Sequence, residues 1–230
     1  MDSKEISHYN KQSLNEIVVS YIKQKILSGE FKSGDKLVES EISNALSISR
    51  APVREAMREL NVQGMISFIP RKGNYVLEMS LDETLEVFDI RIALEKQILE
   101  LLITQKKLQI ADFDHLHRLV DQMASYEKEA LELHEKIYLL NHLDLVFHGY
   151  LWEKSGSLRR GKILENLFYQ LLIIMNRNVS TLGTFHEKAE EHLRILNALQ
   201  KNNLSATIHE FTSHISSYIQ AITDEEHVFE

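Results

Sequence analysis

Residues 36–60 read KLVESEISNALSISRAPVREAMREL, and this stretch decides the fold of the N-terminal part of the chain. The spacing of its apolar residues predicts a short helix over 40–46 and a second helix over 50–63. Ser49 is a good N-cap for the second helix, and Pro52 is tolerated in the first turn because its missing N–H would bond nothing there. Two such helices joined by a short connection predict a helix-turn-helix.

The second of these helices carries a row of cations. Arg50, Arg54 and Arg58 recur every four residues, which places three guanidinium groups on one stripe. An outward row of this kind suits the major groove of DNA, because arginine bonds guanine bidentately or holds phosphates. The alternative is a solvated helix face on which the arginines pair with Glu55 and Glu59.

A hairpin is predicted after the second helix. Residues 65–69 and 74–77 have the composition of short strands, and the turn between them holds Arg71, Lys72 and Gly73. Glycine lets the backbone of such a tip approach another molecule closely, so the hairpin could reach phosphates or the adjacent minor groove. The N-terminal part is therefore predicted to be a winged helix-turn-helix.

The charge distribution divides the chain into two parts. The 230 residues carry a net charge of −8, but residues 1–78 hold 11 Lys and Arg against 10 Asp and Glu, whereas residues 79–230 hold 15 against 24. Both prolines also lie in the first part. We therefore expect two domains, 1–78 and 79–230. A nearly neutral first domain can still bind DNA if its cations share one face.

The second domain is predicted to be an antiparallel bundle of six helices. Their approximate ranges are 82–107, 109–128, 131–154, 158–179, 184–202 and 204–222. With a first helix over 14–27 in the N-terminal domain, the predicted fold class is mainly α. It consists of a winged helix-turn-helix followed by an all-α antiparallel helical bundle.

Composition excludes several classes of protein. The chain has no cysteine, so disulfides and thiolate metal sites are excluded. No apolar run approaches 18 residues, so we expect no transmembrane helix and no membrane partner. The N-terminus lacks the pattern of a signal peptide, and the cytoplasm is the expected location.

Four polar side chains among apolar neighbours predict a metal site in the bundle. Asp144 and His148 are four residues apart on one helix face, and His192 and His214 lie on the last two predicted helices. Three imidazoles and one carboxylate suit a divalent transition metal such as zinc, nickel or manganese. The alternative is that these are ordinary polar residues on exposed faces. The remaining histidines are interpreted as surface residues: His8, His115, His117, His134, His142, His186, His209 and His227.

The N-terminal domain resembles the winged helix of the GntR superfamily of transcription regulators over about residues 14–78. The resemblance is carried by residues 36–60, above all by SRAPVREA at 49–56, and by Gly64-Met65-Ile66 and Arg71-Lys72-Gly73. Ala51 stands where many members carry threonine, which removes one hydroxyl from the expected contact with DNA.

This resemblance implies which residues contact the operator. Arg50 and Arg54 would read the DNA sequence, and Arg58 would contribute to the binding. The remaining expected contacts are Ser49 and Ala51 at the start of the helix, and Lys72 and Gly73 at the tip of the wing.

The second domain resembles the FCD domain, the ligand domain of the FadR-like branch, in its six-helix variant. The similarity is carried by residues 89–95, 144–148, 191–196 and 214–215. All four ligand positions of the metal-binding subset are filled, which implies a bound divalent ion, with zinc favoured over nickel and manganese. The implied ligands are Asp144, His148, His192 and His214.

Members of this branch sense small organic acids beside the metal. Arg91 is the cation that we expect against such a carboxylate, because a guanidinium matches it bidentately. The alternative is an intrahelical pair with Glu95, four residues on. Asn176 and its neighbour Arg177 are weaker candidates, as a polar break in an otherwise apolar helix.

The function expected from these features is that of a transcription regulator and not of an enzyme. A homodimer would read a palindromic operator in double-stranded DNA, and a small organic acid bound beside the metal would change its affinity, with repression favoured. One alternative is a metal sensor, for which the metal itself is the signal. Another is a metal-dependent hydrolase, but the chain has no His-Glu-x-x-His motif, and an enzyme would leave residues 36–73 unexplained.

Overall fold

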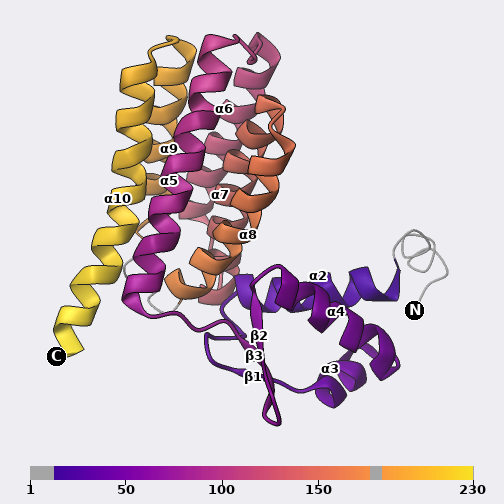
Figure 1. Ribbon diagram of the computed structural model, residues 1–230. Helices are drawn as coiled ribbons and strands as arrows, with labels where there is room; N and C mark the ends of the chain where they lie inside the picture. Colours follow the sequence, from indigo (N-terminus) through magenta and orange to yellow (C-terminus); the bar gives the residue numbers. More distant parts are fainter. Residues whose placement is uncertain (1–12, 177–182, 230) are drawn as a thin grey trace.

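The molecule has an upright bundle of helices with a smaller winged-helix part lying across its lower end (Figure 1). This computed structural model describes residues 13–176 and 183–229. Within these residues, no helix is both long and apolar enough to cross a membrane.

From residue 13 onward, the N-terminal part forms three helices and a small antiparallel sheet. Its elements are α2 (Leu14–Leu27), β1 (Lys36–Leu37), α3 (Glu39–Leu46), α4 (Arg50–Val62), β2 (Ile66–Ile69) and β3 (Gly73–Val76). The strand order is β1-β3-β2, with Ile66 paired to Val76 and Ile69 to Gly73. The predicted strands agree within one residue, whereas β1 lies in a segment for which no strand was predicted.

The N-termini of these helices differ in side-chain capping. Ser13 and Glu16 form a reciprocal capping box at the start of α2. Ser49 occupies the N-cap position of α4 in extended conformation, but its side chain makes no capping hydrogen bond and is exposed. The Ser49 hydroxyl therefore remains available to another molecule, in contrast to that of Ser13.

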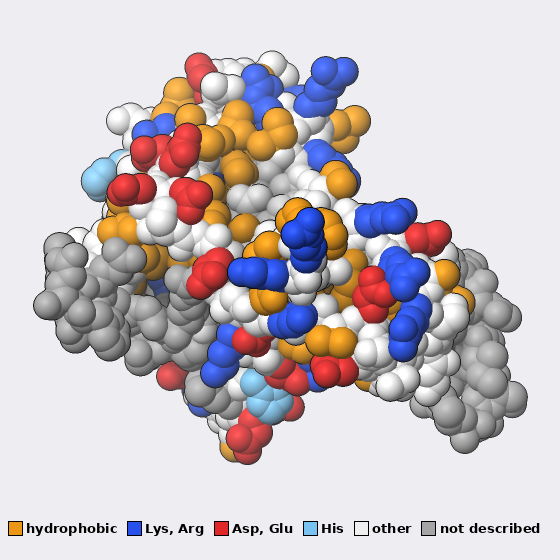
Figure 2. All heavy atoms as spheres, turned by 60° about the horizontal axis from the view of Figure 1, so that its bottom comes forward, with side chains coloured by type: hydrophobic (Ala, Val, Ile, Leu, Met, Phe, Trp, Pro, Cys, Tyr) orange, Lys and Arg blue, Asp and Glu red, His pale blue; other side chains and the backbone are white. Residues whose placement is uncertain are grey.

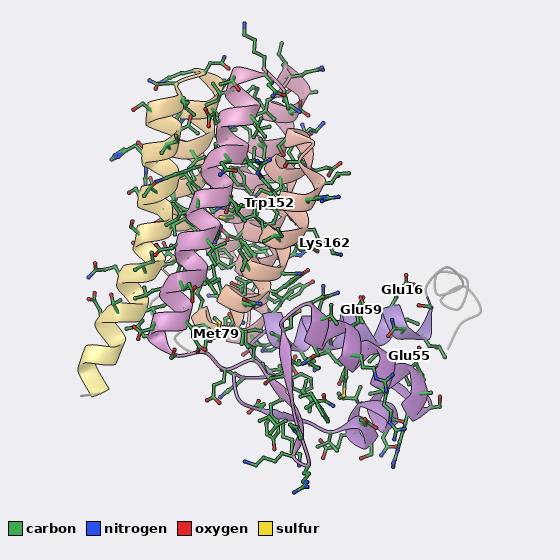
Figure 3. All side chains as sticks on the ribbon, viewed as in Figure 1. Glu16, Glu55, Glu59, Met79, Trp152 and Lys162 are labelled. Atoms are coloured by element: carbon green, nitrogen blue, oxygen red, sulfur yellow. The ribbon has the colours of Figure 1, made fainter. Side chains whose placement is uncertain are left out.

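The C-terminal part is the bundle of six α-helices. Its elements are α5 (Leu81–Thr104), α6 (Ile110–Ser125), the short 3-10 turn η1 (Tyr126–Lys128), α7 (Leu133–Ser155), α8 (Leu158–Met175), α9 (Phe185–Gln200) and α10 (Leu204–Phe229). The number and type of helices agree with the prediction, and α10 runs beyond the predicted end. Residues 77–80 connect β3 to α5, and Figure 3 shows Met79 at the foot of α5.

Two asparagines join the bundle to the winged helix. The Asn176 amide donates to the carbonyl of Ile26 (2.9 Å), and the Asn141 amide donates to the carbonyl of Leu27 (3.1 Å). Asn141 also donates to Oδ1 of Asn176 at 2.7 Å. These bonds satisfy carbonyls that the end of helix α2 leaves without an intrahelical partner. The junction therefore connects α2 to both α7 and α8.

Gly64 provides a test of the packing between the winged helix and α8. Its φ of +73° lies in the left-handed region, and an added Cβ would lie 2.2 Å from Nε2 of Gln170 on α8. Gly64→Ala should therefore lower the free energy of unfolding by about 1–2 kcal/mol. Chemical denaturation of the two proteins measures this difference.

Gly149 is the matched control. It lies inside α7 with nothing within 4 Å of an added Cβ, so Gly149→Ala should raise the free energy of unfolding by about 0.5–1 kcal/mol. Equal signs for the two substitutions would contradict the local geometry described for Gly64.

Candidate metal centre and DNA-binding surface

Three helices of the bundle bring four potential metal ligands to one point. α7 supplies Asp144 and His148, α9 supplies His192 and α10 supplies His214, and all four side chains are buried. One ligand atom from each lies within 4.8 Å of all the others. The sequence-predicted set therefore converges inside the bundle and is not spread over exposed faces.

The distances between these atoms suit a single ion. Oδ1 of Asp144 lies 2.8 Å from Nε2 of His192, 3.7 Å from Nε2 of His214 and 3.9 Å from Nε2 of His148. Two ligand atoms bound tetrahedrally at about 2.1 Å from one ion are about 3.4 Å apart. Although Oδ1 of Asp144 and Nε2 of His192 are close, they do not meet in hydrogen-bond geometry, and both are buried without a hydrogen-bond partner. Such orphaned atoms fit a cation placed between them.

The outer nitrogen of each imidazole has its own acceptor. Nδ1 of His148 lies 2.9 Å from Oε2 of Glu95, Nδ1 of His214 lies 2.8 Å from Oε2 of Glu191, and Nδ1 of His192 lies 2.7 Å from the carbonyl of Lys188. Because a carboxylate or carbonyl only accepts, each Nδ1 carries a proton, and Nε2 is the ring nitrogen that faces the cluster. This arrangement is the one that metal-binding histidines adopt.

The electrostatics of the cluster keep its donors ready to bind a cation. Burial alone would raise the pKa of Asp144, but the three neighbouring imidazoles outweigh it and hold this pKa well below its usual range. Burial, together with the nearby His192 and His148, lowers the pKa of His214 to about 3 despite its bond to Glu191. At neutral pH the carboxylate is therefore charged and this imidazole is neutral, as metal ligation requires.

Arg91 forms the intrahelical pair that was the alternative to a ligand role. Its Nε lies 2.6 Å from Oε1 of Glu95, and both side chains are buried. However, its NH2 nitrogen is buried without a hydrogen-bond partner, and its guanidinium lies 4.6 Å from the centre of the Phe168 ring. One donor of Arg91 therefore remains free for an anion inside the bundle.

Glu95 links Arg91 to the metal cluster. Its Oε2 also accepts from the indole Nε1 of Trp152 at 3.0 Å, and Figure 3 shows Trp152 partway up the bundle. Burial alone would raise the pKa of Glu95, but His148 and Arg91 outweigh it and lower this pKa to about 2. A single buried carboxylate thus binds an imidazole of the cluster, a guanidinium and an indole.

The remaining predicted effector residues and histidines lie elsewhere. Asn176 is at the junction with α2, where both ends of its amide are hydrogen-bonded, and Arg177 lies outside the described residues. Among the other histidines, His115 and His117 are half-buried and four are exposed: His134, His142, His186 and His209. The side chains of His8 and His227 lie outside the description.

The three arginines of α4 are exposed at the lower end of the molecule. Nε of Arg54 bonds Oε2 of Glu39 at 2.7 Å, but the Arg54 side chain keeps 58% of its surface exposed. Arg50 and Arg58 have no ion-pair partner among the described residues, whereas Glu59 bonds Asn15 of α2, beside which Figure 3 shows it. The arginines are therefore not neutralised by the acidic residues of their own helix.

The tip of the wing extends the same basic surface. Arg71 and Lys72 are exposed, and Arg71 and Gly73 have φ values of +65° and +109° in the tight turn between β2 and β3. Figure 2, which looks toward the lower end of the molecule, shows lysine and arginine side chains gathered over this part. Ser49 and Ala51 are exposed at the start of α4.

A groove separates α4 from the wing. It has a volume of about 570 Å³ and is lined on the α4 side by Arg54 and Arg58, and on the wing side by Phe68 and Asn74. The basic helix α4 and the hairpin therefore line the same groove.

Three residues that support the metal cluster were missed as functional residues in the sequence. In the sequence, Glu95 is recognisable only as a partner for Arg91, Glu191 only as part of the stretch 191–196, and nothing distinguishes Lys188. The only local signal was a charged residue on a largely apolar face at helical spacing from a ligand. Such a signal is too common to identify the outer partners of a metal site.

Two family models match the chain. Residues 14–76 match the model described as bacterial regulatory proteins, gntR family, and residues 86–217 match the FCD domain model. Together they cover both structural parts.

Curated relatives and solved structures agree with this match. The chain is 28% identical over 197 residues to the uncharacterised HTH-type transcriptional regulator YdhC of Bacillus subtilis, covering 85% of this chain and 84% of the relative. It is 28% identical to LutR of the same organism, covering 77% and 87%, and 23% identical to the repressor RspR of Escherichia coli, covering 92% and 90%.

The fold of the chain is also similar to that of E. coli McbR/YncC, with a TM-score of 0.80 at 19% identity, covering 94% of this chain and 99% of that one. These relatives are named as regulators and not as enzymes, and the hydrolase interpretation has no support. This protein is a DNA-binding transcription regulator of the GntR family with a C-terminal FCD domain.

Proposed function

We propose that this regulator holds a divalent metal ion, zinc in the first instance, at the buried cluster and senses a small organic acid beside it. The observation that carries the proposal is the orientation of the three imidazoles. Each outer nitrogen is held by an acceptor, so that three inner nitrogens and one carboxylate oxygen point at one site. An ion bound there would act as a Lewis acid, and a zinc ion with four protein ligands can expand to five-coordinate when a carboxylate binds.

The charge of the site supports an anionic ligand. With a divalent ion and neutral imidazoles, the three carboxylates and two cations around the cluster leave one positive charge. A buried uncompensated charge is costly, and a carboxylate would neutralise it. The groups are Asp144, Glu95, Glu191, Arg91 and Lys188. The buried free NH2 of Arg91 provides a second contact for the same anion.

The route to DNA runs through α5 and the junction. Arg91 and Glu95 lie on α5, which follows the wing after residues 77–80. If a ligand binds more tightly to one position of α5 than to another, its binding would favour that position and would shift the winged helix accordingly. We propose that a homodimer in the cytoplasm reads a palindromic operator, and that ligand binding releases it from repression.

The metal site is tested by composition and by one substitution. Protein prepared without chelator should contain about one divalent ion per chain, and His192→Ala should lose it, because deprotonated ligands and their geometry set the affinity. Chelator should lower the melting temperature of the parent, since an ion that binds only the native state stabilises it.

His142→Ala, which removes an exposed histidine from α7, serves as the control and should keep the ion. Elemental analysis and thermal melts provide the measurements. Parent protein that takes up no ion from zinc-containing buffer would remove the basis of the proposal.

The DNA surface is tested through the salt dependence of binding. On a duplex selected by the parent protein from a random pool, Arg54→Ala should weaken binding by about 1–3 kcal/mol. If Arg54 neutralises one phosphate, the slope of log K against log salt should become shallower by about 0.9. Arg159→Ala, an exposed arginine of α8, is the control and should change neither. An unaltered slope and sequence preference in Arg54→Ala would mean that α4 does not face the DNA as described.

The nature of the signal is tested by separate titrations. Fluorescence anisotropy of labelled operator DNA should show metal-loaded protein releasing DNA on addition of simple carboxylates such as acetate or pyruvate, but not of their methyl esters, which carry no charge. Arg91→Met should weaken this response. If zinc alone releases the DNA and no carboxylate has an effect, the protein is a metal sensor.

A further inference from the structure

Lys188 is a buried cation whose charge was counted above but whose ammonium group has been given no specific role. It lies on α9 one turn before His192, and its side chain is 6% exposed. Its Nζ bonds Oε2 of Glu191 at 3.1 Å and Oγ of Ser217 at 3.2 Å, and it lies 3.8 Å from the centre of the Tyr218 ring. A buried lysine with three partners from two helices is held in one position.

The same residue reaches two of the three imidazoles by different routes. Its carbonyl accepts from Nδ1 of His192, and its ammonium holds the Glu191 oxygen that accepts from Nδ1 of His214. On the basis of the metal role proposed above, we infer that Lys188 is a positioning residue. By joining α9 to α10, it fixes the orientation of His192 and His214 toward the ion.

The need for the ammonium follows from the flexibility of Glu191. The Glu191 side chain is 14% exposed, so without a cation beside it this carboxylate could turn toward water and release His214. On the other side of the cluster, Glu95 is fully enclosed and is fixed by Arg91 and Trp152. Each carboxylate that orients an imidazole thus has its own cation, and Lys188 is the one that restrains the more exposed carboxylate.

Metal affinity separates positioning from simple packing. Lys188→Met keeps the length of the side chain and the backbone carbonyl but removes the ammonium. Its zinc affinity, measured by competition with a chromophoric chelator, should fall by about 10–100-fold. The visible spectrum of the cobalt-loaded variant should also differ from that of the parent, because the His214 ligand is no longer fixed. A residue that only packs α9 against α10 would instead lower the melting temperature of the metal-free protein and leave the cobalt spectrum unchanged.

A second substitution tests the route through Glu191. Glu191→Gln should weaken zinc binding as well, and adding Lys188→Met to it should change the affinity by no more than about twofold, because the two groups act in series. Should Lys188→Met not fold, Lys188→Gln takes its place, with a smaller loss expected in the same direction.

Lys154 offers a matched control. Its Nζ also bonds a carboxylate, Asp112, at 2.7 Å and lies 5.2 Å from the ring of Tyr150, but neither contacts the cluster in the described structure. Lys154→Met should leave zinc affinity and the cobalt spectrum unchanged.

The outcomes distinguish this inference from the proposed function. If the parent binds zinc through His192 while Lys188→Met binds it within twofold of the parent, the positioning role is wrong and the metal site stands. The positioning role would also be wrong if Lys188→Met lowered zinc affinity as much in the Glu191→Gln protein as it does in the parent. If the parent itself binds no zinc, both proposals fail together.

Discussion

The structure depends on the enclosure of three imidazoles and a carboxylate inside the helical bundle. Polar groups in such a place are costly unless each finds a partner. Here the outer face of every imidazole is satisfied by the protein, and the inner face is left directed at a common point. This division constrains α5, α7, α9 and α10 together, because each supplies either a ligand or the group that orients one.

The two ends of the molecule use charge in different ways. At the lower end, arginines on α4 and the wing stay in water, where they can exchange solvent and counterions for phosphates. Inside the bundle, Arg91 and Lys188 are buried against carboxylates and act over short distances in a medium that screens little. The net acidity of the chain therefore says little about either surface, since the position of each charge decides what it does.

Sequence patterns predicted the elements better than the contacts between them. Helical periodicity was sufficient for α5–α10. The four residues that converge in the cluster were predicted from Asp144 and His148 at one-turn spacing, from two further histidines among apolar residues, and from the resemblance to the FCD domain. β1 was missed because a two-residue strand exists only through its pairing with β3. Glu95 and Lys188 were missed for a related reason. Glu95 acts through His148, which lies 53 residues further along the chain. Lys188 acts through contacts with both α9 and α10. Local spacing in the sequence does not reveal such contacts.

The asparagine junction has a mechanical consequence for helix α7. Asn141 lies less than one turn before Asp144 on the same helix, so a rotation of α7 that realigns its ligand also swings the Asn141 amide away from the Leu27 carbonyl. The Leu27 carbonyl also accepts from the Asn176 amide at 3.3 Å, so the cost is that of one hydrogen bond, about 0.5–1.5 kcal/mol. That cost corresponds to roughly a 2- to 13-fold change in the ratio of two conformers. Because Asn141 and Asp144 lie within one turn of α7, a movement of this helix at the cluster would be transmitted directly to the last turn of α2.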